Sequence, residues 1–207
     1  MRWLFGGLIS LLFVGCTTSV LPASPFIPES GPCAGLPQYP QDKPPGSLVL
    51  TPDPTLEAMY PATIDGQPVT DLASARYIET LCALSGDAAI AAASQQLPQG
   101  VDLSDLRVAA AQAQVDGAAV TLESFRLPNH RGEELVPVVG ILATTVAGSE
   151  AKFTSGLVQT TAGGRSVWQY TNAADGAVSY LYAAGDTLFI VADVTPSQAD
   201  KVVAALP

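Results

Sequence analysis

The chain has 207 residues, of which 48% are hydrophobic and 14% are charged, and its formal net charge at pH 7 is −10. So acidic a surface repels phosphate backbones, which argues against nucleic acid as a partner and against electrostatic attachment to anionic lipid. The length and apolar content predict one folded domain with a real core.

The first sixteen residues have the features of an export signal. An apolar run of about 13 residues follows Arg2, and as a helix it would span roughly 20 Å, short of the ~30 Å hydrocarbon core. The run ends in Phe13-Val14-Gly15-Cys16, which looks like a lipobox, although such motifs prefer Leu, Val or Ile where Phe13 stands. We predict a lipoprotein signal peptide over residues 1–15 and lipidation at Cys16. A plain secretory signal and an uncleaved short anchor are the alternatives.

Residues 16–54 are rich in proline, serine and glycine, as in the stretch from Asp42 to Gly46. Proline favours extended polyproline geometry, so this composition predicts a semi-rigid tether between the lipid and the domain. The tether would hold the protein on the extracytoplasmic face of the cell membrane, where we expect the domain over residues 55–207.

Cys33 and Cys82 are the two cysteines that remain once Cys16 carries lipid. Exported proteins form disulfides in oxidising compartments, which predicts a Cys33–Cys82 bond. Such a bond would close a loop of about 50 residues and stabilise the fold by roughly 4 kcal/mol. Two buried thiols are the alternative.

Turn signals predict several strand pairs in the domain. Asp-Gly stands between apolar runs at residues 64–67, 115–118 and 174–177, and Gly185-Asp186 separates the runs 178–184 and 187–194. The segment Leu188–Val191 is entirely apolar and predicts a central strand that is covered on both faces.

Three segments predict helices. Thr195-Pro196-Ser197-Gln198 supplies an N-cap, a proline at the first position and a capping-box glutamine for a helix at the C-terminus. Apolar periodicity predicts a second helix over residues 133–146, with Pro137 in its first turn, and an Ala-rich third over residues 87–97. Residues 72–84 suit either a helix or a strand.

These elements predict an α+β fold, with a mainly antiparallel sheet and helices packed on one face in a two-layer sandwich. Two strand–turn–strand–helix units look alike, one beginning at Leu106 and the other at Val167. They suggest an internal ββα pseudo-repeat.

Several phrases of the domain resemble a group of uncharacterised exported bacterial proteins, many of them lipoproteins. The phrases are Tyr60–Val69, Ser104–Ala109, Leu122–Leu127 and Tyr180–Phe189, and the resemblance spans about Leu56 to Pro207. It implies the same strand-and-turn architecture and an envelope location. It brings no catalytic residue or ligand with it.

No catalytic or metal-binding motif stands out, so we predict no catalytic residue, no metal and no cofactor. The single histidine, His130, lies in a polar loop and has no second histidine with which to form a zinc site. Asp102 with Asp105 has the spacing of turn and capping residues, and Glu133 with Glu134 suits the first turn of a helix. Gly163-Gly164 reads as a hairpin turn.

Four aromatic residues form two pairs, Trp168 with Tyr170 and Tyr180 with Tyr182. Each pair has a spacing of two and therefore projects from one face of its strand. If the strands are neighbours, the four rings form a ladder, which would bind a ligand if exposed or pack as core if buried.

The sequence thus predicts a non-enzymatic cell-envelope lipoprotein, a binding or assembly module displayed on a stalk. Its partners would be the membrane, through the N-terminal lipid, and an envelope protein or small ligand. The alternative is an envelope hydrolase whose site is built from scattered carboxylates with help from His130.

Overall fold

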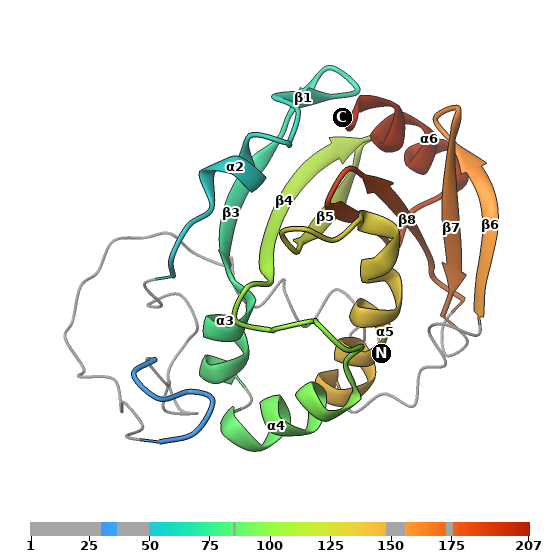
Figure 1. Cartoon of the computed structure of the whole chain (residues 1–207). Coiled ribbons are helices and arrows are strands. Elements are labelled where there is room, and N and C mark those ends of the chain that lie inside the picture. Colours follow the sequence, from blue (N-terminus) through green and yellow to red (C-terminus); the bar gives the residue numbers. More distant parts are fainter. Residues whose placement is uncertain (1–29, 37–49, 85, 148–155, 173–175) are drawn as a thin grey trace.

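The computed structural model describes residues 30–36, 50–84, 86–147, 156–172 and 176–207 (Figure 1). Cys16, the predicted signal segment and most of the predicted tether lie outside these residues. In the described part of the chain, no helix is both long enough and apolar enough to span a membrane.

A seven-stranded antiparallel sheet forms the centre of the molecule. Its order is β3-β4-β5-β9-β8-β7-β6, and β9 occupies the middle. The strands are β3 (Thr70–Arg76), β4 (Arg107–Val115), β5 (Ala118–Arg126), β6 (Leu157–Ala162), β7 (Arg165–Thr171), β8 (Val178–Ala184) and β9 (Thr187–Ala192). Every residue of β9 is buried, which confirms the predicted central strand.

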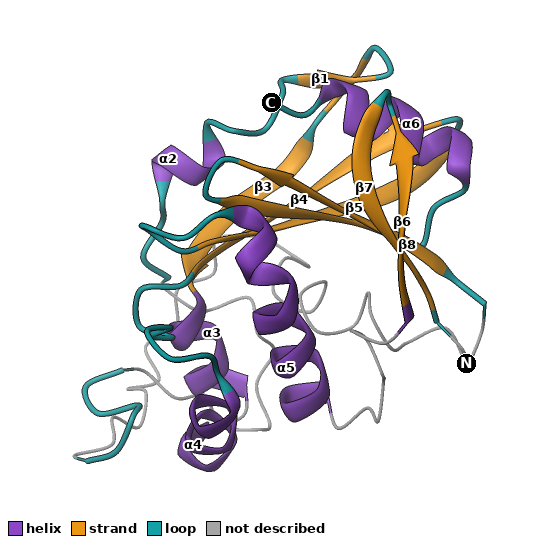
Figure 2. Ribbon diagram, turned by 45° about the vertical axis from the view of Figure 1, so that its right-hand side comes forward, coloured by secondary structure: helices purple, strands orange, loops and turns teal. Residues whose placement is uncertain are grey.

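Helices cover one face of this sheet, as the sequence predicted. They are α3 (Tyr77–Leu84), α4 (Gly86–Gln96) and α5 (Leu135–Ala147), which follows the 3₁₀ turn η2 (Gly132–Glu134). Figure 2 shows these helices below the sheet. Their apolar side chains and one face of the sheet form what we call the helix-side core. The α+β class and the antiparallel sheet are therefore confirmed, and the packing of these helices on one face is consistent with a two-layer sandwich.

Smaller elements cover the opposite face of the sheet. They are α2 (Pro54–Glu57), the hairpin of β1 (Thr63–Ile64) with β2 (Gln67–Pro68), and α6 (Pro196–Ala205). Together with the sheet they form a second apolar cluster, the hairpin-side core. Because α5 and α6 lie on opposite faces, the two ββα units do not repeat in three dimensions.

Two of the Asp-Gly turns that the sequence predicts form hairpins in the structure. Asp65 and Gly66 join β1 to β2, Asp116 and Gly117 join β4 to β5, and all four have positive φ, which matches a two-residue hairpin turn. Gly185, with φ +60°, begins the turn between β8 and β9. Ala174 and Asp175 of the predicted turn at residues 174–177 lie outside the described residues.

One lysine ties two of these turns to the last helix. Lys201 Nζ on α6 lies 2.8 Å from Asp65 Oδ2 and 2.5 Å from Asp116 Oδ1. The hydrogen bond from Lys201 holds the pKa of Asp65 below its usual range. The helix begins as predicted, because Thr195 caps it, Pro196 is its first residue and Gln198 completes the capping box.

Residues 72–84, whose sequence suits either a helix or a strand, contain one of each. It is a strand up to Arg76 and a helix from Tyr77 onward. The predicted helices at 87–97 and 133–146 are confirmed as α4 and α5, with Pro137 in the first turn of α5.

Candidate functional site

The aromatic pairs lie on neighbouring strands but do not form a ladder. Trp168 stands opposite Leu181, and Tyr180 stands opposite Gln169, so the pairs are one residue out of register. A shift of one residue reverses the face of a strand. Trp168 and Tyr170 consequently pack with the helix-side core, and Tyr180 and Tyr182 with the hairpin-side core. The four rings make no common surface, and Tyr170 and Tyr180 are buried.

Cys33 and Cys82 form the predicted disulfide, with their Cα atoms 5.5 Å apart. Both are buried. Cys33 N also donates to Asp87 Oδ1 on α4 at 2.8 Å. This short segment before the domain is thereby fixed to both α3 and α4.

His130 and Asp102, two of the polar residues considered in the hydrolase hypothesis, each have a local partner. His130 Nδ1 lies 3.2 Å from Glu134 Oε2. Asp102 Oδ1 accepts a hydrogen bond from Ser104 N, which lowers the pKa of Asp102. No described contact joins His130 to Asp102. Within the described residues, no three His, Cys, Asp or Glu side chains are placed to hold a metal ion.

Sequence reasoning missed a buried acid in the middle of the sheet. Glu123 on β5 stands opposite Ala110 on one side and Ile190 on the other, and its Oε1 has no hydrogen-bond partner. Burial raises the pKa of Glu123 to about 8, and the nearby charge of Asp193 adds to the effect. The carboxyl is therefore held in its neutral form at neutral pH.

A second feature that the sequence reasoning missed is a row of arginines. Arg76, Arg107 and Arg126 end three adjacent strands, and each stands directly opposite the next. We call these three residues the arginine row. They make up a third of the nine Lys and Arg residues of the chain. Like charges placed directly opposite each other destabilise a sheet, so the row conflicts with ordinary strand pairing.

Carboxylates lie near both ends of the arginine row, but most of them have other bonds. Glu79 is 3.9 Å from Arg76 NH1, yet its two oxygens already accept from Thr51 N and Oγ1 at 2.8 and 2.7 Å. Asp53 is 3.7 Å from Arg126 NH1 and uses its Oδ1 to cap α2. The close contact is between Arg126 Nε and Asp186 Oδ2, at 2.8 Å.

Arg107, in the middle of the row, has no carboxylate partner among the described residues. Its NH1 donates to the carbonyl oxygens of Ser104 at 2.9 Å and Leu106 at 3.4 Å. Arg76 NH2 also donates to Ser104 O, and its Nε is buried without a hydrogen-bond partner. Two neighbouring guanidinium groups thus have N–H donors that no carboxylate of the described chain accepts.

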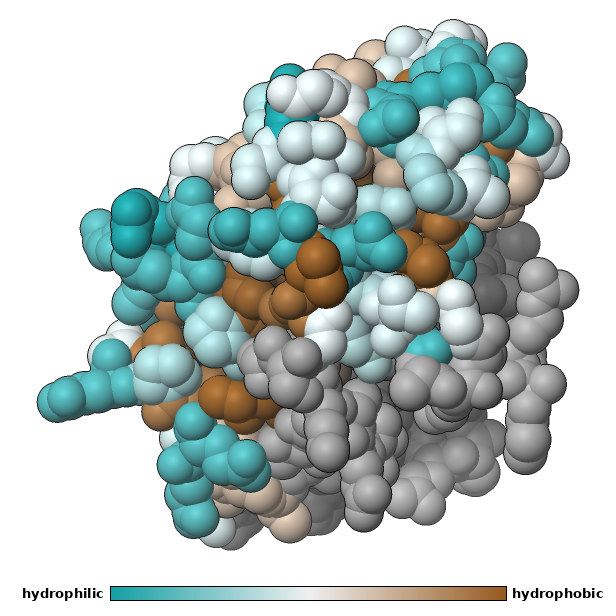
Figure 3. All heavy atoms as spheres, turned by 90° about the vertical axis from the view of Figure 1, so that its right-hand side faces the viewer, coloured by the Kyte–Doolittle hydropathy of each residue, from teal (hydrophilic) through white to brown (hydrophobic). Residues whose placement is uncertain are grey.

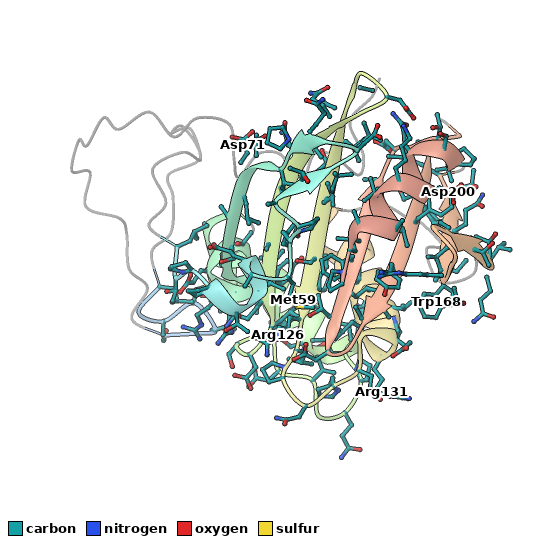
Figure 4. All side chains as sticks on the ribbon, turned by 90° about the horizontal axis from the view of Figure 1, so that it is seen from above. Met59, Asp71, Arg126, Arg131, Trp168 and Asp200 are labelled. Carbon is teal, nitrogen blue, oxygen red and sulfur yellow. A yellow bond between two sulfur atoms is a disulfide. The ribbon has the colours of Figure 1, made fainter. Side chains whose placement is uncertain are left out.

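A polar network beside α2 fixes the surroundings of the arginine row. Ser74 Oγ donates to Glu57 Oε1 at 2.7 Å and accepts from Asp53 N at 2.6 Å. The Tyr60 hydroxyl lies 2.8 Å from Ser124 Oγ, and burial raises its pKa. Figure 4 shows Arg126 and Trp168 well apart across the sheet. These hydrogen bonds join α2 and its flanking residues to β3 and β5.

Comparison with protein-family models, curated proteins and solved structures finds no match for this chain.

Proposed function

We propose that this protein is a non-enzymatic binding or assembly module of the cell envelope, anchored by lipid on Cys16. The apolar run before Cys16 and the Pro-rich composition of residues 16–54 support an exported, tethered domain. The Cys33–Cys82 disulfide also supports it, because disulfides persist in oxidising compartments.

The arginine row carries the binding part of the proposal. Residues that break a local rule of stability without an evident compensating contact are expected at functional sites. Arg107 lies between two other arginines and has no carboxylate partner in the described residues. An anionic group of a ligand would relieve this repulsion and accept the remaining N–H donors of Arg107 and Arg76. Guanidinium groups recognise phosphate and carboxylate alike.

The anion part is tested by titrating the full chain with inorganic phosphate and with succinate and following the unfolding temperature. Both anions should raise the unfolding temperature of the wild-type protein, and Arg107→Gln should abolish most of the rise. Arg131→Gln is the matched control, since Arg131 is exposed and pairs with Glu134, which does not pair with any arginine of the row. Equal rises in wild type and Arg107→Gln would show that the anions act elsewhere.

The anchor part is tested by fractionating cells that express the full chain or Cys16→Ser. Wild type should be found in the membrane fraction with an acylated N-terminal peptide by mass spectrometry. Cys16→Ser should lose the acyl mass and leave that fraction. A wild-type protein that keeps an unmodified Met1 would overturn the anchor without touching the anion result.

A further inference from the structure

The two edges of the seven-stranded sheet differ in their protection against further strand pairing. At the β3 edge, Asp71 has φ +53°, and the register with β4 shifts between Thr70 and Ala73. Asp71 and Arg76 place charges on this edge, and α2 packs against the strand. Bulges, charged side chains and covering elements are the devices by which proteins prevent edge-to-edge association.

The β6 edge carries no charged side chain, no proline and no bulge, although α6 packs against this strand as α2 does against β3. Its sequence is Leu157-Val158-Gln159-Thr160-Thr161-Ala162, without a charge or a proline. The register with β7 is unbroken from Leu157 to Ala162. Val158 is 63% exposed, the one large apolar side chain of the described residues that is so exposed. Figure 3 views the molecule from this side, where hydrophobic residues reach the surface among hydrophilic ones.

We propose that β6 is an interface between two copies of this chain, which pair β6 to β6 across a two-fold axis. A two-fold axis perpendicular to a sheet makes identical edge strands antiparallel, and every pairing within this sheet is antiparallel. The two sheets would then continue into one another, as in strand addition.

Charge favours a second copy on this edge over the rest of the surface. The molecule has a net charge of −10, so most surfaces of two copies repel each other. β6 has no charged side chain, and pairing it with itself brings no like charges into direct opposition. The Val158 side chain would also lose exposed area on pairing.

Symmetry further restricts how the two strands align. Directly opposed residues in an antiparallel pair alternate between hydrogen-bonded and non-hydrogen-bonded positions. A two-fold axis must map each kind of position onto itself, so it passes through a pair formed by one residue and its own copy. One residue of β6 therefore lies directly opposite the same residue of the other copy. The residue before it lies opposite the residue that follows it in the other copy.

The association is tested by sedimentation equilibrium on the full chain over a range of concentrations. Wild type should rise from the mass of one chain to twice that mass. Gln159→Lys should stay at the mass of one chain, because it places a charge on an exposed side chain near the axis. Gln112→Lys is the matched control, an exposed glutamine on the same face of interior strand β4, and should behave as wild type. A wild type that stays monomeric at every concentration, or a Gln159→Lys dimer as stable as wild type, would overturn the proposal.

A cysteine scan tests the pairing itself, using Val158→Cys, Gln159→Cys, Thr160→Cys and Thr161→Cys in a Cys16→Ser background. Opposed Cα atoms in an antiparallel pair lie about 4.5–5.5 Å apart, within the range of a disulfide. One position should cross-link to its own copy strongly and its neighbours weakly. No cross-linking at any position, or equal cross-linking at all four, would contradict a β6–β6 pair, as would a heterologous strand bound at this edge in its place.

Discussion

Arg107 and Arg126 stand directly opposite each other in the adjacent strands β4 and β5. Arg76 stands opposite Arg107 on the other side, so the middle guanidinium has a like charge on both flanks. Cross-strand pairs of this kind change stability by roughly 0.2–1 kcal/mol, with a sign that follows the charges. The arginine row thus carries an electrostatic cost in the protein without a bound anion.

Replacing Arg107 by glutamate and by glutamine separates this cost from lost hydrogen bonds, because both variants lack the guanidinium bond to Ser104 O. Arg107→Glu creates two opposite-charge pairs, whereas Arg107→Gln creates none. We expect the Glu variant to be more stable than the Gln variant by about 0.5–1 kcal/mol at low salt. Urea denaturation measures the difference, which should shrink at 1 M salt. A Gln variant that is the more stable at low salt would contradict the expected repulsion.

Glu123 predicts a pH dependence of stability. Burial raises its pKa from 4.5 to about 8, so the folded protein keeps a proton that the unfolded chain releases. The contribution of Glu123 to the unfolding free energy is at its maximum below pH 4.5 and falls as the pH rises from 4.5 to 8. The fall amounts to about 1.4 kcal/mol for each pH unit between the unfolded-state and folded-state pKa values. Glu123→Gln does not titrate, so its unfolding free energy should lack this fall.

The measurement is urea denaturation of wild type and Glu123→Gln at closely spaced pH values. The free-energy difference between the two proteins should change in favour of the variant as the pH rises through this window, and level off above about pH 8. Parallel curves for the two proteins would mean that the carboxyl is ionised in the folded state.

Local signals in the sequence predicted the helices and strands, but they did not predict which side chains share a face of the sheet. Thr195 and Gln198 lie within one turn of helix and predicted α6 correctly. The face of Tyr180 relative to Trp168 depends on the register of β7 with β8, which no pattern within either strand reveals. A one-residue difference there separates a ladder from two pairs on opposite faces.

The arginine row could have been found in part from sequence. A two-residue turn at Asp116-Gly117 fixes the β4–β5 register, and Arg107 and Arg126 are equidistant from that turn. The position of Arg76 in the row could not be predicted, because two helices lie between β3 and β4 in the chain and no short turn fixes the register of these strands. Glu123 was hidden for a different reason, since a single carboxylate in a strand gives no sign of whether a helix layer covers it.

The disulfide predicts a large difference between oxidised and reduced protein. It joins residues separated by 49 positions, for which the chain-entropy relation gives about 4 kcal/mol. Urea denaturation of the same protein with and without reductant measures this. Cys33→Ala/Cys82→Ala should match the reduced protein to within the effect of the altered side chains. Equal stabilities of oxidised and reduced wild type would contradict the prediction.

Two neighbouring glycines predict unequal costs of adding a methyl group. Gly163 and Gly164 both have positive φ, at +57° and +76°, so alanine is strained at each by about 1–2 kcal/mol. At Gly163 a Cβ would also overlap the backbone of Ala204 on α6, whereas at Gly164 nothing lies within 4 Å. Thermal unfolding should show a larger loss for Gly163→Ala than for Gly164→Ala. Equal losses would mean that α6 is free to move away from the hairpin.

The Cys33–Cys82 bond also decides how the fold would carry a mechanical load. A pull applied on the N-terminal side of Cys33 passes through the sulfur atoms to α3, because that covalent route is shorter than the chain from Cys33 to Cys82. Residues between the two cysteines, including α2, the small hairpin and the bulged edge strand β3, are then outside the loaded path to the C-terminus. Stretching the oxidised chain end to end would leave these residues unextended, and reducing the bond would place them on the loaded path.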